Sequence, residues 1–490
     1  MTTTAQNSAC DLLLFGSNGD LARRKLLPAL YQLEKAGLLA EGSRIFGIAR
    51  NEFDQDSYRD MVKQNLVRFI KRETLDEEVW QRLAQRLQYV QMDLSKTEDY
   101  QKLASLLQPD QRISVSYFAT PPSLFGSLCE GLASAGLNAE PARVVLEKPI
   151  GHDLASSRMI NDQVAAYYKE CQIYRIDHYL GKETVLNLLA LRFANAIFAS
   201  NWDHNAIDHV QITVAEEVGV EGRWSYYDDA GQMRDMVQNH LLQVLSLIAM
   251  EPPARLDADS IRDEKLKVLK ALRRIDRSNF AEKTVRGQYG SGFVAGQAAP
   301  GYLEEEGARP NSKTETFVAI KVDIDNWRWA GVPFYLRTGK RMPKKHSEVV
   351  ICFKPQPHNI FHENYSELPA NKLIIRLQPD EGVEVQVMNK IPGLGESMRL
   401  QQSKLDLSFD ETFKSQRIAD AYERLLLEAM LGNQYLFVRR DEVEQAWQWV
   451  DSILDAWKHS NEAPKTYQAG SWGPVAAISM MARDERNWDE

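Results

Sequence analysis

The sequence predicts an α/β domain with a parallel sheet over residues 1–180, followed by a larger α+β domain with a mainly antiparallel sheet over residues 181–490. The first domain is predicted because apolar strand-like runs alternate with amphipathic helical runs, a pattern typical of parallel sheets with crossover helices. The second is predicted because strand-like runs after about residue 200 follow one another without intervening helices. The length of 490 residues also favours two domains over one.

Six apolar segments are the strand candidates of the first domain. Between them lie helical patterns such as "LARRKLLPALYQLEKAG", in which apolar residues recur every three or four positions and a glycine closes the run. The strand candidates are residues 11–16, 44–50, 88–94, 113–120, 143–149 and 172–176.

The second domain has five strand candidates, with helical patterns before and after them. Helices that bracket a run of strands fit an α+β domain. The strand candidates are residues 209–218, 316–327, 348–355, 371–379 and 382–389, and the helical ones are 233–250, 417–432 and 441–460.

Composition and charge narrow the class of protein. Apolar residues make up 44% and charged residues 26%, as in ordinary soluble proteins. A net charge of −9 does not favour a nucleic-acid partner, and no apolar run has the length of a membrane span. The N-terminus lacks a secretory pattern, and the four cysteines are scattered without a C-x-x-C pair. We therefore expect a cytoplasmic protein with no metal site, no membrane association and no nucleic-acid partner.

The first strand candidate leads into "GSNGDLARRK", which reads as a turn and a helix start. Gly16 permits the tight turn, and Gly19 lets backbone N–H groups approach a phosphate. Asp20 and the helix N-terminus complete a possible anion site. The spacing is G-x-x-G-x-x-A rather than G-x-G-x-x-G, and such glycines are often structural. Their place after the first strand nevertheless favours a dinucleotide site.

The second strand ends at Arg50, where NAD enzymes tend to carry an acid and where an arginine suits a 2′-phosphate. A solvated strand-end cation is an equal alternative for Arg50. Lys25 adds positive charge beside the first turn, unless it simply faces water. Lys148 precedes a proline, which aims it into the crevice at the carboxyl end of the sheet, although a surface lysine is the slightly simpler interpretation.

Two further strand ends carry residues that suit a dinucleotide cleft. Asp93 and Leu94 are placed to flank an adenine, and Ala119 and Pro121 are placed to line the cleft. A purely structural role is the alternative for both pairs, because aspartate and proline are common in turns.

The segment "YRIDHYLGKE" places Asp177, His178, Tyr179 and Lys182 around Gly181 at a predicted strand end. An imidazole, a phenol and an ammonium group presented together indicate a small ligand.

Polar residues in three other segments have simple structural explanations. His240 lies on the apolar face of a helical pattern, where a core histidine is the usual interpretation. Asp235 suits a helix cap, and Glu216 suits a solvent-facing position after a strand. The basic residues between 337 and 345, which include Lys340 and Lys345, form either a solvated face or part of an anion pocket.

The segments "GSNGDLARRK", "EKPIG", "RIDHYLGKE", "EGRWSYYDDAGQMRDMVQNH" and "RTGKRMPKK" occur in the order seen in the glucose-6-phosphate dehydrogenase family. The sequence resembles bacterial members of this family from about residue 11 to about residue 475. The resemblance implies a Rossmann-type NADP-binding domain and an α+β domain for substrate binding and oligomerisation. It also implies oxidation of D-glucose 6-phosphate at C1 to 6-phospho-D-glucono-1,5-lactone, the first step of the oxidative pentose phosphate pathway.

The resemblance further implies a role for each matching residue. His240 resembles the general base, and Asp177 resembles the carboxylate that orients it. His178, Tyr179 and Lys182 resemble a phosphate clamp. The residues that resemble those holding the sugar hydroxyls and completing the pocket are Glu216, Asp235, Lys340 and Lys345. Lys148 resembles the lysine that bridges coenzyme and substrate, and the family has a cis bond before the residue that matches Pro149.

The coenzyme is expected to be NADP, with NAD retained as an alternative, because Asn51 after Arg50 leaves the strictness of the choice open. We expect no second, structural NADP of the eukaryotic kind, and a homodimer or homotetramer. The expected coenzyme-binding residues are Gly16, Ser17, Gly19, Asp20, Leu21, Lys25, Arg50, Asp93, Leu94, Ala119, Pro121 and Lys148.

Two alternatives share parts of this pattern. Enzymes like glucose–fructose oxidoreductase also have a Rossmann domain, an "EKP" tripeptide and a sheet-based second domain, but they lack "RIDHYLGKE" and are usually shorter. A redox-sensing binding protein that kept the coenzyme fold is the non-enzymatic alternative. The presence of both His240 and Asp177 disfavours it.

Overall fold

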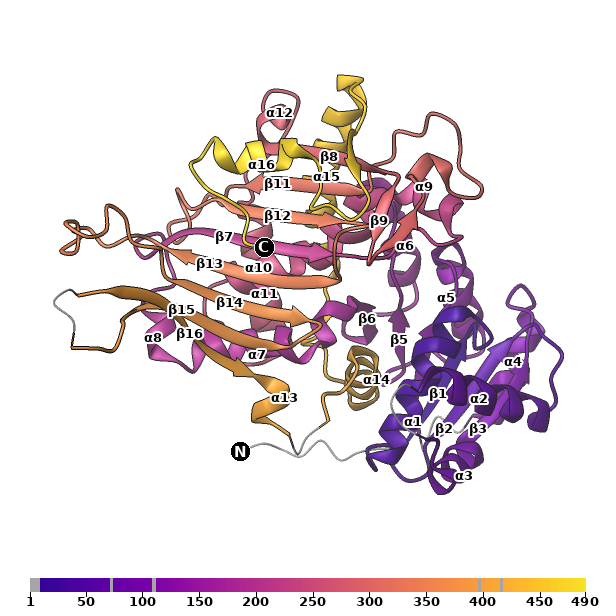
Figure 1. Ribbon diagram of the computed structural model, residues 1–490. Coiled ribbons are helices and arrows are strands. Elements are labelled where there is room, and N and C mark those ends of the chain that lie inside the picture. The colour runs from indigo at the N-terminus through magenta and orange to yellow at the C-terminus, as the bar shows by residue number, and fades with distance from the viewer. Residues whose placement is uncertain (1–8, 71–73, 108–111, 395–397, 415–416) are drawn as a thin grey trace. The chain divides into compact units, whose positions relative to one another are not determined.

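A computed structural model describes residues 9–70, 74–107, 112–394, 398–414 and 417–490 (Figure 1). The chain divides into two compact units. Unit 1 contains residues 1–182, 253–263 and 419–444, and unit 2 contains residues 183–252, 264–418 and 445–490. The functional division predicted at residue 180 stays a prediction.

Unit 1 is built on a seven-stranded sheet with the order β17-β6-β5-β4-β1-β2-β3. Six strands pair in parallel, as predicted, and β17 is antiparallel to β6. Every residue of β1 is buried, as expected for a strand covered on both faces. The strands are β1 (Cys10–Phe15), β2 (Arg44–Ala49), β3 (Leu87–Gln91), β4 (Ile113–Phe118), β5 (Arg143–Leu146), β6 (Ile173–Ile176) and β17 (Phe437–Val438).

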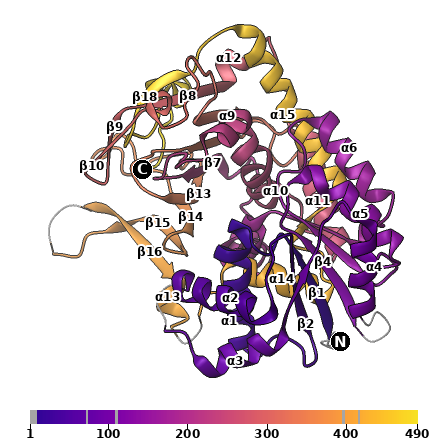
Figure 2. The ribbon, with the colours of Figure 1, turned by 90° about the vertical axis from the view of Figure 1, so that its right-hand side faces the viewer.

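Helices cover both faces of this sheet, with α1, α2 and α3 on one side and α4, α5 and α6 on the other (Figure 2). The predicted helix after β1 begins as a π-helical turn, η1 (Ala22–Leu26), and continues as α1 (Leu27–Lys35). The other helices are α2 (Gln55–Phe69), α3 (Glu77–Arg86), α4 (Thr97–Leu106), η2 (Pro122–Leu124), α5 (Phe125–Ser134), α6 (Leu154–Ala165), η3 (Glu170–Gln172), η4 (His178–Gly181) and α14 (Ala421–Leu431).

The helix α14 belongs to unit 1 although it lies late in the chain. Asp420 caps it, because its carboxylate accepts a hydrogen bond from the Tyr422 N–H, and Gly432 ends it in a left-handed conformation. It packs against η1, α1 and η4.

Unit 2 is built on a nine-stranded sheet with the order β16-β15-β14-β13-β7-β12-β11-β8-β18, most of which can be followed in Figure 1. The sheet is mainly antiparallel, as predicted, but β7 pairs in parallel with β12 and β18 pairs in parallel with β8. The strands are β7 (Ile207–Ala215), β8 (Thr284–Gly290), β11 (Phe317–Val322), β12 (Phe334–Gly339), β13 (His346–Phe353), β14 (Lys372–Gln378), β15 (Gly382–Lys390), β16 (Leu400–Ser408) and β18 (Lys465–Gln468). A separate ribbon pairs β9 (Gly292–Val294) with β10 (Gln297–Ala299).

The helix predicted over 233–250 is two helices of different winding. It starts as a π-helix, η5 (Met233–Leu241), and continues as α10 (Leu242–Ala249), whose residues are all buried. The remaining helices are α7 (Glu183–Phe193), α8 (Ala196–Ala199), α9 (Trp224–Gln232), α11 (Ala258–Ala271), α12 (Phe280–Lys283), η6 (Tyr302–Glu304), α13 (Phe409–Thr412), α15 (Arg440–Ser460) and α16 (Val475–Ala482). Among the described residues, no helix combines the length and apolar character that a membrane span requires.

Candidate active site

A cavity of about 610 Å³ lies at the carboxyl ends of the parallel strands of unit 1. Ligands of open α/β sheets bind at this edge. Gly16, directly after β1, has φ +85°, and a Cβ there would meet the Ala119 carbonyl. The backbone N–H groups of Gly16 and Ser17 donate to the Ile48 carbonyl, which fixes the turn against β2. The glycine is therefore required both by its conformation and by the close approach of β4.

Seven of the expected coenzyme-binding residues line this cavity: Gly16, Gly19, Arg50, Asp93, Leu94, Ala119 and Pro121. Five do not line it: Ser17, Asp20, Leu21, Lys25 and Lys148. Ser17 is buried, Asp20 pairs with Arg24 at 3.2 Å, and the Lys25 ammonium pairs with Asp420 at 2.9 Å.

Two amides beside Arg50 were missed by sequence reasoning. The Asn18 side chain donates to Asn51 Oδ1 at 2.9 Å, and Arg23 Nε donates to Asn18 Oδ1 at 3.1 Å. Both amides line the cavity. The signal that could have found them is their position, because Asn18 lies inside the glycine turn and Asn51 directly follows Arg50. Thr120, Leu124 and Ser127 also line the cavity without having been predicted.

The end of β3 carries a carboxylate with a lowered pKa. Asp93 accepts hydrogen bonds from the Ser95 backbone N–H at 3.1 Å and from its hydroxyl at 2.8 Å. The backbone hydrogen bond is the largest cause of the lowered Asp93 pKa, and the nearby Arg50 charge adds to it. Asp93 therefore places a fixed negative charge on the cavity wall, opposite in sign to Arg50.

Lys148 follows a buried carboxyl group. Glu147 accepts a hydrogen bond from the Tyr117 hydroxyl, and burial raises the Glu147 pKa while the Lys148 charge opposes the rise. The Lys148–Pro149 peptide bond is cis, as the resemblance implied.

Two of the predicted phosphate-clamp residues, His178 and Tyr179, lie on η4 after β6, and the third, Lys182, is its C-cap. The Asp177 carboxylate accepts a hydrogen bond from the Tyr179 N–H at 2.9 Å and so caps the short helix. The Lys182 ammonium lies over the Tyr179 ring, 4.3 Å from its centroid. The His178 ring stacks on Tyr422 of α14, with ring centroids 6.2 Å apart. The segment thus presents an imidazole, a phenol and an ammonium group together.

The late helix α14 supports this segment. A Cβ on Gly181 would lie 2.6 Å from the Ala421 carbonyl oxygen and 3.0 Å from Leu425 Cγ. The absence of a side chain therefore lets η4 and α14 approach closely.

Two of the expected sugar-binding residues form a fixed pair in unit 2. Lys340 Nζ and Glu216 Oε2 are 2.8 Å apart, and the Lys340 side chain is almost completely buried. The backbone supports the pair, because the Glu216 N–H donates to the Gly339 carbonyl and the Tyr467 hydroxyl donates to the Lys340 carbonyl. Lys345 lies on an exposed turn before β13 and takes no part in this pair.

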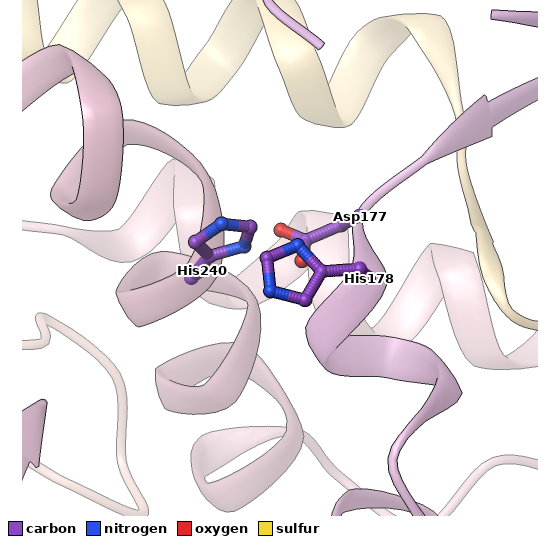
Figure 3. A group of neighbouring side chains, drawn as sticks. All are labelled: Asp177, His178 and His240. Carbon is purple, nitrogen blue, oxygen red and sulfur yellow. The ribbon is translucent and has the colours of Figure 1, made fainter. Parts of the chain in front are cut away.

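Asp235 and His240 both lie on the π-helix η5. The His240 side chain is completely buried, at 0% exposed. Figure 3 shows His240 projecting from its helix, and Asp177 and His178 projecting from the segment after β6. The α-helical face predicted for His240 is replaced by π-helical winding, which changes its neighbours along the helix.

Comparisons with known proteins show which family the chain is similar to. Family models described as "Glucose-6-phosphate dehydrogenase, NAD binding domain" and "Glucose-6-phosphate dehydrogenase, C-terminal domain" match residues 13–187 and 189–489. The chain is 65% identical to a glucose-6-phosphate 1-dehydrogenase of Dickeya dadantii, over 100% of this chain and 99% of the relative.

Two solved structures are similar over nearly the full length. One is a glucose-6-phosphate dehydrogenase in complex with glucose 6-phosphate, at 35% identity, a TM-score of 0.91 and 99% coverage of both chains. The other is the glucose-6-phosphate 1-dehydrogenase of Mycobacterium avium, at 39% identity and a TM-score of 0.87, covering 99% of this chain and 98% of that one.

Proposed function

Since this chain belongs to the glucose-6-phosphate dehydrogenase family, we propose that Asp177, the N-cap of η4, and His240 of η5 carry its catalysis. The enzyme is an oxidoreductase that oxidises D-glucose 6-phosphate at C1 to the 1,5-lactone and uses NADP. This is the entry step of the oxidative pentose phosphate pathway. The observation that carries the assignment of this activity is the 65% identity, over the full chain, to a glucose-6-phosphate 1-dehydrogenase.

The coenzyme cavity of unit 1 fits a dinucleotide phosphate. Gly16 and Gly19 leave the turn without side chains, and Arg50 supplies the charge that a 2′-phosphate requires. We assign Gly16, Gly19, Arg50, Asp93, Leu94, Ala119 and Pro121 to this site, with Lys148 as the bridge to the substrate. When bound, NADP supplies the acceptor for the hydride that leaves C1.

We assign the substrate phosphate to His178, Tyr179 and Lys182. Their donors are of the type that binds a dianion, and charge-assisted hydrogen bonds contribute roughly 1.5–3 kcal/mol each before losses. Glu216, Asp235, Lys340 and Lys345 are proposed to hold the sugar hydroxyls and complete the pocket. Glu216 and Lys340 already form one rigid pair, so they offer a preorganised acceptor and donor.

We assign the general base to His240. As the C1–H bond breaks and the hydride leaves, the C1 hydroxyl proton must leave too, so that the lactone carbonyl can form. A neutral imidazole ring nitrogen takes this proton at physiological pH. Asp177 is proposed to orient the imidazole and to stabilise its charged form.

We also propose that the enzyme is a cytoplasmic homodimer or homotetramer. The support for self-association is the edge strand β16, which is exposed along most of its length and carries Leu405 at 66% exposed and Leu407 at 45% exposed. An exposed apolar edge is a natural surface for association.

The test of the proposed base is His240→Asn, with His209→Asn as a matched control. His209 is a buried histidine of β7 in the same unit, hydrogen-bonded to Asp208 and Gln211. We expect His240→Asn to bind glucose 6-phosphate but to lose roughly 10²- to 10⁴-fold in kcat. Asp177→Asn should also lower kcat, and His209→Asn should not. Near-normal turnover of folded His240→Asn at saturating substrate would show that His240 is only a core residue.

A further inference from the structure

The π-helical winding of η5 changes which of its residues share a side. In an α-helix, neighbours on one face are three or four residues apart. In a π-helix the hydrogen bonds join residues five apart, so residues five apart lie nearer to one side than they do in an α-helix. Asp235 and His240 are five residues apart, and the bond from the Leu242 N–H to the Val237 carbonyl is of this type. The winding therefore places Asp235 and His240 nearer to one side of η5 than α-helical winding would.

The start of η5 is held by one buried side chain. The Met233 N–H, at the first position of the helix, donates to a carboxylate oxygen of Glu315 at 3.0 Å. The preceding Gln232 N–H donates to the Glu315 main-chain carbonyl at 3.0 Å. Glu315 is 5% exposed, so it is an internal anchor rather than a surface cap. Two successive backbone N–H groups therefore donate to the same residue.

A second contact set fixes the residue before the helix. Gln232 Nε2 donates to the Thr338 hydroxyl of β12 at 2.8 Å, and Gln232 Oε1 accepts from the Tyr227 hydroxyl at 2.6 Å. Gly231 has φ +70°, and a Cβ there would lie 2.5 Å from Glu315 Oε1. The chain therefore turns sharply at Gly231 and enters η5 at a point that Glu315 defines.

We propose that Glu315 is a positioning residue for the oxidation of glucose 6-phosphate. By fixing where η5 begins, it fixes the register in which Asp235 and His240 face the same side. If this anchor is lost and the first turns adopt α-helical hydrogen bonds, residues five apart point roughly 140° away from each other. This inference rests on the proposed roles of Asp235 and His240.

The experiment compares Glu315→Ala, which removes the acceptor, with Glu315→Gln, which keeps a side-chain oxygen at the same reach. Small misplacements of catalytic groups are costly, so we expect Glu315→Ala to lower kcat by roughly 10- to 100-fold. Glu315→Gln should recover most of kcat. The Kd for NADP should stay unchanged in both variants, because the coenzyme cavity belongs to unit 1.

A matched control separates positioning from stability. Thr284 of β8 is buried in unit 2, and its hydroxyl accepts a hydrogen bond from Trp457 Nε1 at 2.9 Å. Thr284→Val removes one buried acceptor, as Glu315→Ala does, and should lower the melting temperature without lowering kcat. If Glu315→Ala does not fold, Glu315→Asp is used in its place and compared with Glu315→Gln. The Asp variant withdraws the carboxylate by one methylene, so we expect it to have the lower kcat of the two.

The outcomes distinguish this proposal from the one on which it rests. The positioning role would be overturned if folded Glu315→Ala had a kcat within twofold of wild type, even with His240→Asn inactive. If Glu315→Ala does not fold, the same criterion applies to Glu315→Asp. Equal damage in Glu315→Ala and Glu315→Gln would overturn it too, because the acceptor oxygen would then not matter. Full turnover of His240→Asn would instead remove the proposed base, independently of Glu315.

Discussion

At the scale of single residues, Arg50 is the side chain that we propose decides the choice of coenzyme. It lines the cavity at the end of β2, beside Asn18 and Asn51. Its guanidinium can form a bidentate pair with a 2′-phosphate, which NAD lacks.

We predict that Arg50→Ala weakens NADP binding by roughly 10- to 100-fold, because a charge-assisted contact of about 1.5–3 kcal/mol is lost. NAD binding should be nearly unchanged. Titration of both coenzymes, followed by fluorescence or calorimetry, measures the two Kd values. An equal loss for NADP and NAD would mean that Arg50 does not contact the 2′-phosphate.

Some of the residues that line the coenzyme cavity could be predicted from the sequence. Gly16 and Arg50 were found because strand ends and turns are local features. Asn18 and Asn51 were missed because nothing local shows that two amides 33 residues apart will bond to each other. The place of Lys25 in the coenzyme site stays a prediction; its pairing with Asp420, 395 residues away, cannot be inferred from the sequence.

At the scale of elements, the contact between η4 and α14 fixes the predicted phosphate clamp. The helical pattern of residues 417–432 predicted α14 itself, and residues 421–431 confirm it. Its docking on η4 could not be predicted, because an apolar helix face does not specify its partner. The π-winding of η5 was missed for a related reason, since the apolar spacing of 233–250 fits an α-helix and the anchor at Glu315 lies outside the segment.

We predict that Gly181→Ala raises the KM for glucose 6-phosphate and lowers the melting temperature. The added Cβ would meet a backbone carbonyl at 2.6 Å, so η4 or α14 must move, and such overpacking costs roughly 1–3 kcal/mol. Steady-state kinetics and thermal unfolding measure the two effects. Gly290→Ala is the control, because its nearest neighbour is a side-chain methyl of Thr466 at 3.3 Å. An unchanged KM would show that the position of η4 does not influence phosphate binding.

At the scale of the whole molecule, the C-terminal segment is tied to the sheet of unit 2 by ion pairs. Arg486 donates two hydrogen bonds of 2.8 Å to Asp208, and Lys321 and Lys372 pair with Asp484 and Asp489 at 2.6 Å. The Asp208 pKa is lowered, first by the hydrogen bond from Arg486 and further by His209.

We predict that the ion pair between Asp208 and Arg486 weakens at acidic pH. Because the folded-state pKa of Asp208 is lowered, its contribution is fully present above the unfolded value, roughly 4, and is lost as the pH falls toward the folded value. Asp208→Asn should lower stability at pH 7 by about 1 kcal/mol, since the side chain is 32% exposed and the pair is partly screened.

The measurement is the melting temperature of wild type and Asp208→Asn between pH 7 and pH 3. The difference between them should shrink as the pH falls below about 4. Asp455→Asn is the control, because its pairing with Arg277 is exposed and contributes little. A difference that stays constant over this range would contradict the assignment.

At the scale of the whole molecule, the sequence predicts the two sheets, because the periodicity of strands and the order of strands and helices are features of the local sequence. The parallel pairing of β7 with β12 was not, because pairing between strands more than 100 residues apart is decided by packing rather than by local pattern.

The return of residues 419–444 to unit 1 also bears on how the protein is made. On the ribosome, β6 is complete once residue 176 has been synthesised, but its neighbour β17 does not exist until residue 438. At a translation rate of roughly 5–20 residues per second, this interval lasts on the order of ten to fifty seconds. Throughout it, the nascent first unit lacks both the strand that closes its sheet edge and the helix that covers η1 and η4. Unit 1 begins to emerge first, yet it cannot be completed until nearly the whole chain has been synthesised.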